Sequence, residues 1–203
     1  MVDTSTAPRP HSKITTFAKI TTDVTSVGVL VAVQVALAAW HSASDASSAL
    51  SYGALAVTFA SIIPMAYVFY GTHFGDLVSH HIPVRQRRLI PMCVGLASLT
   101  VGALVLALIG APAYLVNVMV MNVAGLAMLT AITLSWKISA HTSTTAATIT
   151  MLVFVFGPPA LIATPAVLLT GWSRLHLRAH TRSQVVIGAI LGAAVNAGLH
   201  LAL

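Results

Sequence analysis

Glutamate is absent from this sequence, and acidic residues of any kind are scarce. The four acids are Asp3, Asp23, Asp45 and Asp76. Without glutamate, the chain cannot contain the HExxH motif of zinc peptidases or a pair of catalytic glutamates. It also has no glycine-rich loop that ends in Lys-Ser or Lys-Thr, which excludes a P-loop and the ATP hydrolysis that such loops support.

Cysteine is almost as rare, since Cys93 is the only one. A single cysteine cannot form an intrachain disulfide or a cysteine-rich metal site. A lyase or cyclase that ionises a prenyl diphosphate would need clusters of acidic residues to hold Mg²⁺, and the four scattered aspartates form none. We therefore expect neither a metal ion nor another cofactor.

Charged residues of either sign are also few. They make up 7% of the 203 residues, against 57% for hydrophobic residues, and the mean hydropathy is +0.91. In a soluble domain roughly a quarter of the residues are charged, so water cannot be the solvent for most of this surface. We predict an all-α, polytopic transmembrane helix bundle of six to seven membrane segments, each of about 20 apolar residues or fewer where neighbouring helices shelter it.

The chain divides into a short polar tail and one membrane-embedded domain. Residues 1–20 are polar and carry three cations, so we expect a flexible N-terminal tail, followed by a single domain over residues 21–203. Long apolar runs mark the membrane segments. These are predicted at residues 24–41, 50–70, 91–110, 113–135, 143–157, 160–172 and 184–202.

The Gly157-Pro158-Pro159 step decides the topology. Two consecutive prolines remove two backbone donors and resist the continuation of a helix. We therefore favour a turn between two short helices over one long tilted helix across residues 143–172. One long helix would place residues 139–141 and 173–180 on opposite membrane faces, whereas the turn places all polar clusters on one face.

The ten lysines and arginines all fall on that same face in this topology. The positive-inside rule then places the N-terminus and the polar clusters in the cytoplasm. The sequence pI of about 10.1 reflects cations that flank membrane segments, which indicates anionic lipid head groups as partners rather than nucleic acid.

Nearly all residues that can act on a polar group lie in four clusters. Charge inside a bilayer is costly, so a chain keeps it there for a functional reason. The clusters combine cations, a hydroxyl and histidines, which are the three elements of a site that handles an anion. They are residues 76–88, residues 137–141, Ser173-Arg174 and His180.

The order and spacing of these clusters resemble the type 2 phosphatidic acid phosphatase superfamily of membrane phosphatases. That family carries three motifs in order: Lys-x6-Arg-Pro, then Pro-Ser-Gly-His, then Ser-Arg-x5-His-x3-Asp. The corresponding stretches here are His81-x6-Arg88 with the proline displaced to Pro91, then Ile138-Ser139-Ala140-His141, then Ser173-Arg174-x5-His180-x3-Gln184. The resemblance covers about residues 70–200, the third motif is the most specific, and the chain looks like a small actinobacterial branch.

The resemblance implies a role for each matched residue. His180 would be the nucleophile that forms a phospho-histidine intermediate, and His141 would protonate the departing alkoxide and then activate water. Guanidinium groups bind phosphate oxygens bidentately, and the amides at a helix N-terminus bind anions. The expected substrate-binding residues are His81, Arg88, Lys137, Ser139, Ala140 and Arg174.

Two positions depart from the family motifs. Gln184 stands where the family has the aspartate that orients the nucleophilic histidine; it can accept a hydrogen bond and fix a tautomer, but it brings no charge. His81 stands at the family lysine position and is only partly charged near neutral pH, so Lys137 is an alternative for that role. Asp76 is the only acid near any cluster and could substitute spatially for the missing aspartate.

The function that the resemblance implies is a metal-independent lipid phosphate phosphatase in a bacterial plasma membrane, with its site on the cytoplasmic face. A polyprenyl phosphate or prenyl diphosphate is the first choice of substrate, and phosphatidic acid or phosphatidylglycerophosphate is the second. A non-catalytic protein that binds lipid phosphates is the alternative from another class, because Gln184 replaces an aspartate of the family.

Overall fold

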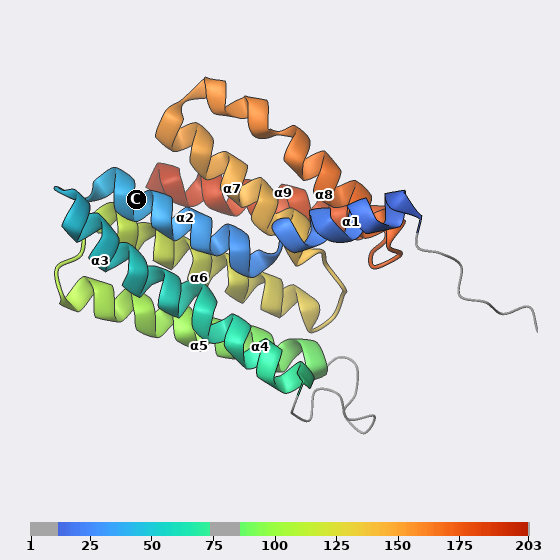
Figure 1. Cartoon of the computed structure of the whole chain (residues 1–203), viewed down its shortest axis with the longest axis horizontal. Helices are drawn as coiled ribbons and strands as arrows, with labels where there is room; N and C mark the ends of the chain where they lie inside the picture. Colours follow the sequence, from blue (N-terminus) through green and yellow to red (C-terminus); the bar gives the residue numbers. More distant parts are fainter. Residues whose placement is uncertain (1–11, 74–85, 203) are drawn as a thin grey trace, which may run out of the picture.

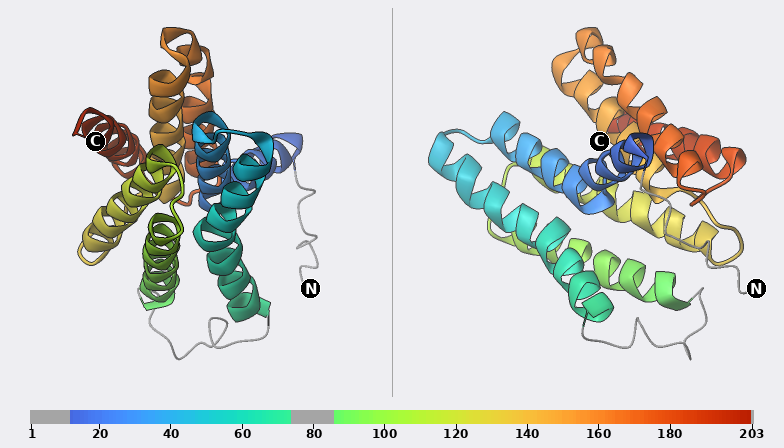
Figure 2. Two further views of the ribbon diagram at one scale, coloured as in Figure 1. Left: turned by 90° about the vertical axis from the view of Figure 1, so that its left-hand side faces the viewer. Right: turned by 45° about the vertical axis from the view of Figure 1, so that its right-hand side comes forward.

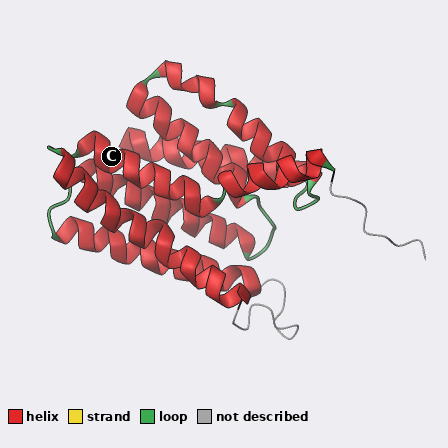
Figure 3. Ribbon diagram, viewed as in Figure 1, coloured by secondary structure: helices red, strands yellow, loops and turns green. Residues whose placement is uncertain are grey.

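The computed structural model describes residues 12–73 and 86–202, with the side chains of residues 86–88 excepted. Every regular element in these ranges is helical (Figures 1 and 3). The α-helices are α1 (Lys13–Val24), α2 (Val27–Ser42), α3 (Ala46–Val57), α4 (Ile63–His73), α5 (Gln86–Leu108), α6 (Ala113–Thr133), α7 (Ala140–Phe156), α8 (Pro165–His176) and α9 (Arg182–Ala202). A π-helical turn (Thr58–Ile62) joins α3 to α4, and a 3₁₀-helix (Pro158–Ala163) precedes α8.

Among the described residues, four helical stretches are long and apolar enough to cross a membrane: Ala46–His73, Leu89–Leu108, Ala113–Thr133 and Arg182–Ala202. A fifth arises if α1 and α2, which meet at an angle of 42°, are taken as one bent span. Large apolar side chains remain on the outer surface, with Leu108 85% and Ile162 88% exposed. Such a surface is stable in hydrocarbon rather than in water, so the fold is compatible with a membrane helix bundle.

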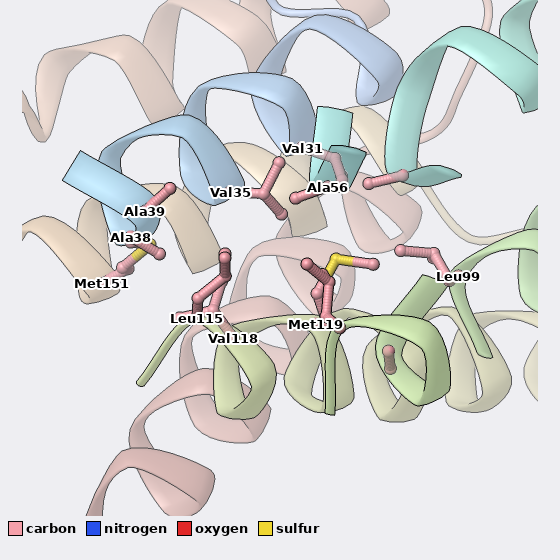
Figure 4. Packing of buried hydrophobic residues seen from close by; sticks show 13 residues of the cluster. Val31, Val35, Ala38, Ala39, Ala56, Leu99, Leu115, Val118, Met119 and Met151 are labelled. Carbon is pink, nitrogen blue, oxygen red and sulfur yellow. The ribbon is translucent and has the colours of Figure 1, made fainter. Parts of the chain in front are cut away.

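The core of the bundle lies where α2, α3, α5, α6 and α7 meet (Figure 4). Val35 of α2, Leu115 and Met119 of α6 and Leu106 of α5 are fully buried there. Two of the four α2 residues in this core are the alanines Ala38 and Ala39, and small residues let neighbouring helices approach closely, as is usual in membrane bundles. Of the helices that carry the later polar clusters, α7 contributes to this core through Met151.

The helical stretch from α3 to α4 remains continuous although it contains Pro64, because a wider π-helical turn precedes this proline. Pro64 has no N–H to offer the carbonyl of Ala60, and its ring crowds the preceding turn. The chain widens into the π-helical turn Thr58–Ile62 just before this proline, and the carbonyl of Phe59 accepts a hydrogen bond from Ser98 Oγ at 2.6 Å. The hydroxyl of Ser98 therefore ties α5 to this wide turn.

The turn that the paired prolines predict is present. Helix α7 ends at Phe156, and Gly157 follows with φ of +78°, a backbone conformation that favours glycine. Pro158 and Pro159 open the 3₁₀-helix, and α8 runs back along α7, as the hairpin in Figures 1 and 2 shows. The sixth predicted segment, 160–172, is instead a 3₁₀-helix followed by α8.

Part of the predicted N-terminal tail is helical in the structure. Residues 13–20, expected to be flexible, belong to α1, which packs along α8. Ser12 caps this helix by accepting a hydrogen bond from Thr15 N at 3.3 Å. The threonines of α1 led to the prediction of a polar tail. The helix instead contacts α8 through the hydroxyl groups of Thr15 and Thr22, and no local sequence pattern indicates these contacts.

The two described connections that carry polar clusters lie at one end of the bundle. In Figure 1 the α6–α7 and α8–α9 connections, the end of α4 and the start of α5 lie toward the right-hand side. The α2–α3 and α5–α6 connections and the C-terminus lie on the left. The hairpin at Gly157 makes this arrangement possible, because it returns the chain to the end from which α7 began.

Candidate active site

The site begins at the N-terminus of α7. Ser139 is the N-cap of this helix, and its hydroxyl accepts a hydrogen bond from Thr142 N at 3.5 Å. Ser139 is fully buried and its hydroxyl caps the helix; the contact with a substrate that the resemblance implies for it stays a prediction. Ala140 and His141 follow in the first turn, where backbone N–H groups have no acceptor within the helix.

The start of α9 is joined to the N-terminus of α7. The backbone N–H of Ser139 donates to the carbonyl of Gln184 at 3.2 Å, and Thr142 Oγ1 donates to the carbonyl of Val185 at 3.1 Å. Gly188 lies at the contact: a Cβ there would come within 2.6 Å of the Ser139 carbonyl oxygen. The two helices meet backbone to backbone because a small residue stands at the crossing.

Helix α8 ends in a tight loop that presents His180. The carbonyl of Arg174 accepts hydrogen bonds from the backbone N–H groups of Ala179 at 3.0 Å and of His180 at 3.3 Å. Arg178, which lies between Arg174 and Ala179 in this loop, has φ of +50°. The ammonium group of Lys137 donates a hydrogen bond to the carbonyl of Ala179. Lys137 therefore ties the α6–α7 connection to the loop that carries His180.

The imidazole of His180 is oriented by Gln184. Nδ1 of His180 donates to Gln184 Oε1 at 3.1 Å, and the same oxygen accepts the backbone N–H of Thr181 at 3.2 Å. An amide oxygen can only accept, so the proton of the neutral imidazole lies on Nδ1 and the lone pair on Nε2. Gln184 thus makes the hydrogen bond that the sequence led us to expect of it.

Arg174 is a half-buried cation whose side chain meets a hydroxyl rather than a carboxylate among the described residues. Its Nη1 donates to Thr22 Oγ1 at 3.4 Å, and its buried Nε has no hydrogen-bond partner in this part of the chain. A buried N–H of a charged group that lacks an acceptor costs free energy, on the order of 1–3 kcal/mol. An oxyanion at this position would supply the missing acceptor.

Arg174, His141 and His180 come together although they lie on three different segments. The ring of His141 is close enough to interact electrostatically with both the Arg174 guanidinium and the His180 ring. Helix α8 supplies the arginine, the first turn of α7 supplies one histidine, and the loop before α9 supplies the other. The two later motifs of the sequence therefore form one cluster at the end of the bundle.

A series of hydroxyl groups beneath this cluster was not foreseen. Thr22 of α1 lies 3.2 Å from Ser173 Oγ as well as beside Arg174. Deeper between α7 and α8, Thr145 and Thr170 lie within hydrogen-bond distance at 3.3 Å, and Thr145 also donates to the carbonyl of His141. The only signal in the sequence was an abundance of threonine, which also fits helix capping.

Three predicted site residues are not placed by the structure. Asp76 and His81 lie outside the described residues, and the backbone of Arg88 is in the first turn of α5 while its side chain is not described. The roles expected of these three residues stay predictions. The described part of the site therefore consists of the second and third motifs.

The described residues contain no group of three or more His, Cys, Asp or Glu side chains that could hold a metal ion. The cluster instead offers one guanidinium, two imidazoles and the amides of a helix N-terminus. Guanidinium groups and the amides of a helix N-terminus are typical binding partners of an anion. No family model, no curated protein and no solved structure matches this chain.

Proposed function

We propose that this protein is a membrane lipid phosphate phosphatase of the type 2 phosphatidic acid phosphatase kind, with His180 as nucleophile and His141 as general acid and base. The observation that carries the proposal is the environment of Arg174. Its guanidinium lies near His141, which in turn lies near His180, and within the described ranges its buried Nε has no acceptor. A phosphate group bound there would complete these contacts.

The reaction would proceed in two steps. The lone pair on Nε2 of His180 attacks phosphorus, an N–P bond forms, and the P–O bond to the lipid oxygen breaks while His141 gives that oxygen its proton. A water molecule then attacks phosphorus and passes its proton to His141, and the N–P bond breaks. From a lipid monophosphate the products are a lipid alcohol and inorganic phosphate, with both histidines restored; from a diphosphate, attack on the terminal phosphorus releases the lipid monophosphate in place of the alcohol.

Charge stabilisation would come from three sources. Arg174 and the amides of Ala140 and His141 would face the equatorial oxygens of the phosphoryl group, where charge accumulates in the transition state. Lys137, bonded to the Ala179 carbonyl, adds positive charge nearby and holds the His180 loop. Arg88 and His81 of the first motif are also proposed to bind the phosphate.

The placement of the site suits a lipid substrate. The cluster lies at one end of the bundle, next to long apolar helices, so a phosphate could reach the histidines while its lipid tail stays in hydrocarbon. We propose a prenyl phosphate or diphosphate as substrate, in the plasma membrane of a bacterium and with the site facing the cytoplasm. Phosphatidic acid and phosphatidylglycerophosphate are the second choice.

Phosphate release from purified protein tests the proposal. The wild type should release phosphate from at least one of these lipids in the presence of EDTA, because no step needs a metal ion. His180→Ala should lose this release, whereas His176→Ala, which changes the neighbouring histidine that stacks on Trp172, should keep it. Acid-labile, alkali-stable labelling of the wild type by ³²P substrate would identify the phospho-histidine.

A non-catalytic lipid phosphate binder is the second candidate function. It is favoured by Gln184, which orients His180 but cannot neutralise the imidazolium as an aspartate would. This candidate predicts that the wild type and His180→Ala release equally little phosphate, while both bind prenyl phosphate. That outcome would replace the phosphatase proposal with the binding one.

A further inference from the structure

A cavity of about 540 Å³ lies inside the bundle, next to the candidate active site. Its wall comes from the π-helical turn Thr58–Ile62 and six α-helices: α2, α4, α5, α6, α7 and α9. The volume falls within the range of about 300–1,000 Å³ that is typical of pockets for small organic ligands. The histidines and Arg174 do not line it, so the proposed reaction gives it no role.

The exposed wall is mostly apolar, with polar contributions from the amide side chains of Gln34, Asn122 and Asn196. Most of its residues are aliphatic, small or methionine, and Met65, Met92 and Met121 line it from three different helices. Methionine side chains are flexible and adapt to irregular apolar ligands. Such a cavity suits a hydrocarbon chain better than a polar metabolite.

The cavity reaches the candidate active site at the N-terminus of α7. Ala140 and Ser143 line it, while His141, which lies between them in the sequence, faces the α8 side together with Thr145 and Thr170. The first turn of α7 therefore separates the cavity from the histidines. A phosphate on the amides of this turn would stand at the end of the cavity.

The volume limits what the cavity can hold. At about 30 Å³ per heavy atom, the share of one water molecule in the liquid, 540 Å³ corresponds to roughly 18 heavy atoms. One chain of three isoprene units has fifteen carbons and fits this space. The two long acyl chains of a phosphatidic acid do not fit together.

We propose that this cavity binds the single hydrocarbon chain of a prenyl phosphate, with about three isoprene units inside the protein. This inference rests on the proposed function for the position of the phosphate, and it selects single-chain lipids over diacyl lipids as the substrate class. On the α4 side the wall includes Met65 and Phe69, which are 45% and 59% exposed. The cavity thus borders the outer surface there, where the chain of a longer lipid can continue into the bilayer.

Gly125 of α6 allows the cavity to be filled selectively. It lines the cavity, and a Cβ at this position would meet no atom within 4 Å. Gly198 of α9 is a matched control, because its Cβ would also meet nothing within 4 Å and it does not line the cavity. Gly125→Phe should occupy the cavity, and Gly198→Phe should project elsewhere.

The experiment measures binding of farnesyl phosphate to purified protein by photo-crosslinking with a diazirine analogue and competition by unlabelled lipid. Gly125→Phe should weaken competition by farnesyl phosphate at least about tenfold, since several buried methylene groups lose their site. Gly198→Phe should compete like the wild type. Unlabelled phosphatidic acid should compete at least about tenfold less well than farnesyl phosphate.

Each other outcome overturns the inference. Unchanged binding by Gly125→Phe shows that the chain lies elsewhere, and equal competition by phosphatidic acid shows that single-chain lipids are not selected. If Gly125→Phe fails to fold by size-exclusion chromatography, the smaller Gly125→Val takes its place with the same expected direction. Binding is measured without turnover, so a wild type that binds farnesyl phosphate but releases no phosphate contradicts the phosphatase proposal and not the cavity assignment.

Discussion

Gln184 joins the two halves of the site through two different groups: its side-chain Oε1 lies 3.1 Å from His180 Nδ1, and its backbone carbonyl accepts the N–H of Ser139 at 3.2 Å. The residue that orients one histidine is thus bonded to the cap of the helix that carries the other. A change at this position should therefore alter catalysis through the side chain while the backbone contact stays in place.

Replacing Gln184 by glutamate should shift the pH dependence of the reaction. A carboxylate next to His180 favours the imidazolium and raises the pKa of His180 relative to the wild type. Because the nucleophile must be unprotonated, the acid limb of the pH profile should move to higher pH: as the pH falls, Gln184→Glu should lose activity before the wild type does. The pH profile of kcat/KM in both proteins measures this shift.

Gln184→Leu provides the matched control for that prediction. It removes the acceptor without adding charge, so the imidazole loses its fixed orientation. The rate should fall, but the acid limb of the pH profile should remain at the wild-type pH and should not move to higher pH as it does in Gln184→Glu. Identical pH profiles for wild type and Gln184→Glu would contradict a nucleophilic role for His180.

Arg174→Lys should be nearly as damaging as removal of the guanidinium. Lysine keeps the charge but cannot bind two phosphate oxygens with a rigid pair of N–H groups. We expect kcat/KM to fall on the order of 10²- to 10³-fold, the usual effect of removing one donor to the transition state. Steady-state kinetics of Arg174→Lys and Arg174→Leu test this, with Arg182→Lys at the exposed start of α9 as control. A wild-type rate in Arg174→Lys would mean that charge alone suffices at this position.

Gly192→Ala should destabilise the protein and separate the histidines. A Cβ at Gly192 would overlap the carbonyl oxygen of Ser143, so α7 and α9 must move apart. Crowding of this kind costs about 1–3 kcal/mol, and the melting temperature in detergent should fall. Gly198→Ala on the same helix meets nothing within 4 Å and should melt at or slightly above the wild-type temperature, since alanine favours the helix. Equal melting of both variants would show that the helices do not meet at Gly192.

Cysteine labelling should place the two ends of the bundle on opposite membrane faces. Cys93 is the only native cysteine, so single cysteines can be introduced into Cys93→Ser. Ser183→Cys, beside the candidate active site, should react with an impermeant maleimide only after the membrane is permeabilised. Ser44→Cys, in the α2–α3 connection, should react in intact cells. The reverse pattern would place the site outside the cytoplasm.

Much of the helical framework could be predicted because its apolar runs are long. The predicted segment at 113–135 agrees with α6 to within two residues, and the last one agrees with α9. Helix α1 was missed because its apolar residues alternate with threonines and lysines and form no long run. The π-helical turn was also missed, since Pro64 alone does not specify which wider turn precedes it.

The candidate site could be predicted only as a set of residues. Spacing identified His141, Arg174 and His180, but it could not reveal that Ser139 is buried as a helix cap or that Lys137 is bonded to the Ala179 carbonyl. Thr22 lies 152 positions before Arg174 in the sequence, and only the packing of α1 on α8 brings their side chains together.

The sequence by itself indicated an apolar environment, the helical class and the position of the turn. Its composition favours hydrocarbon over water around it, and two adjacent prolines strongly disfavour the continuation of a helix. Tertiary structure alone decided how closely α7 and α9 approach, that Arg174 Nε has no hydrogen-bond acceptor among the described residues, and where the cavity lies. These properties depend on distances between segments far apart in the chain, and such distances are set by packing, because a pattern of residues constrains only its own neighbourhood.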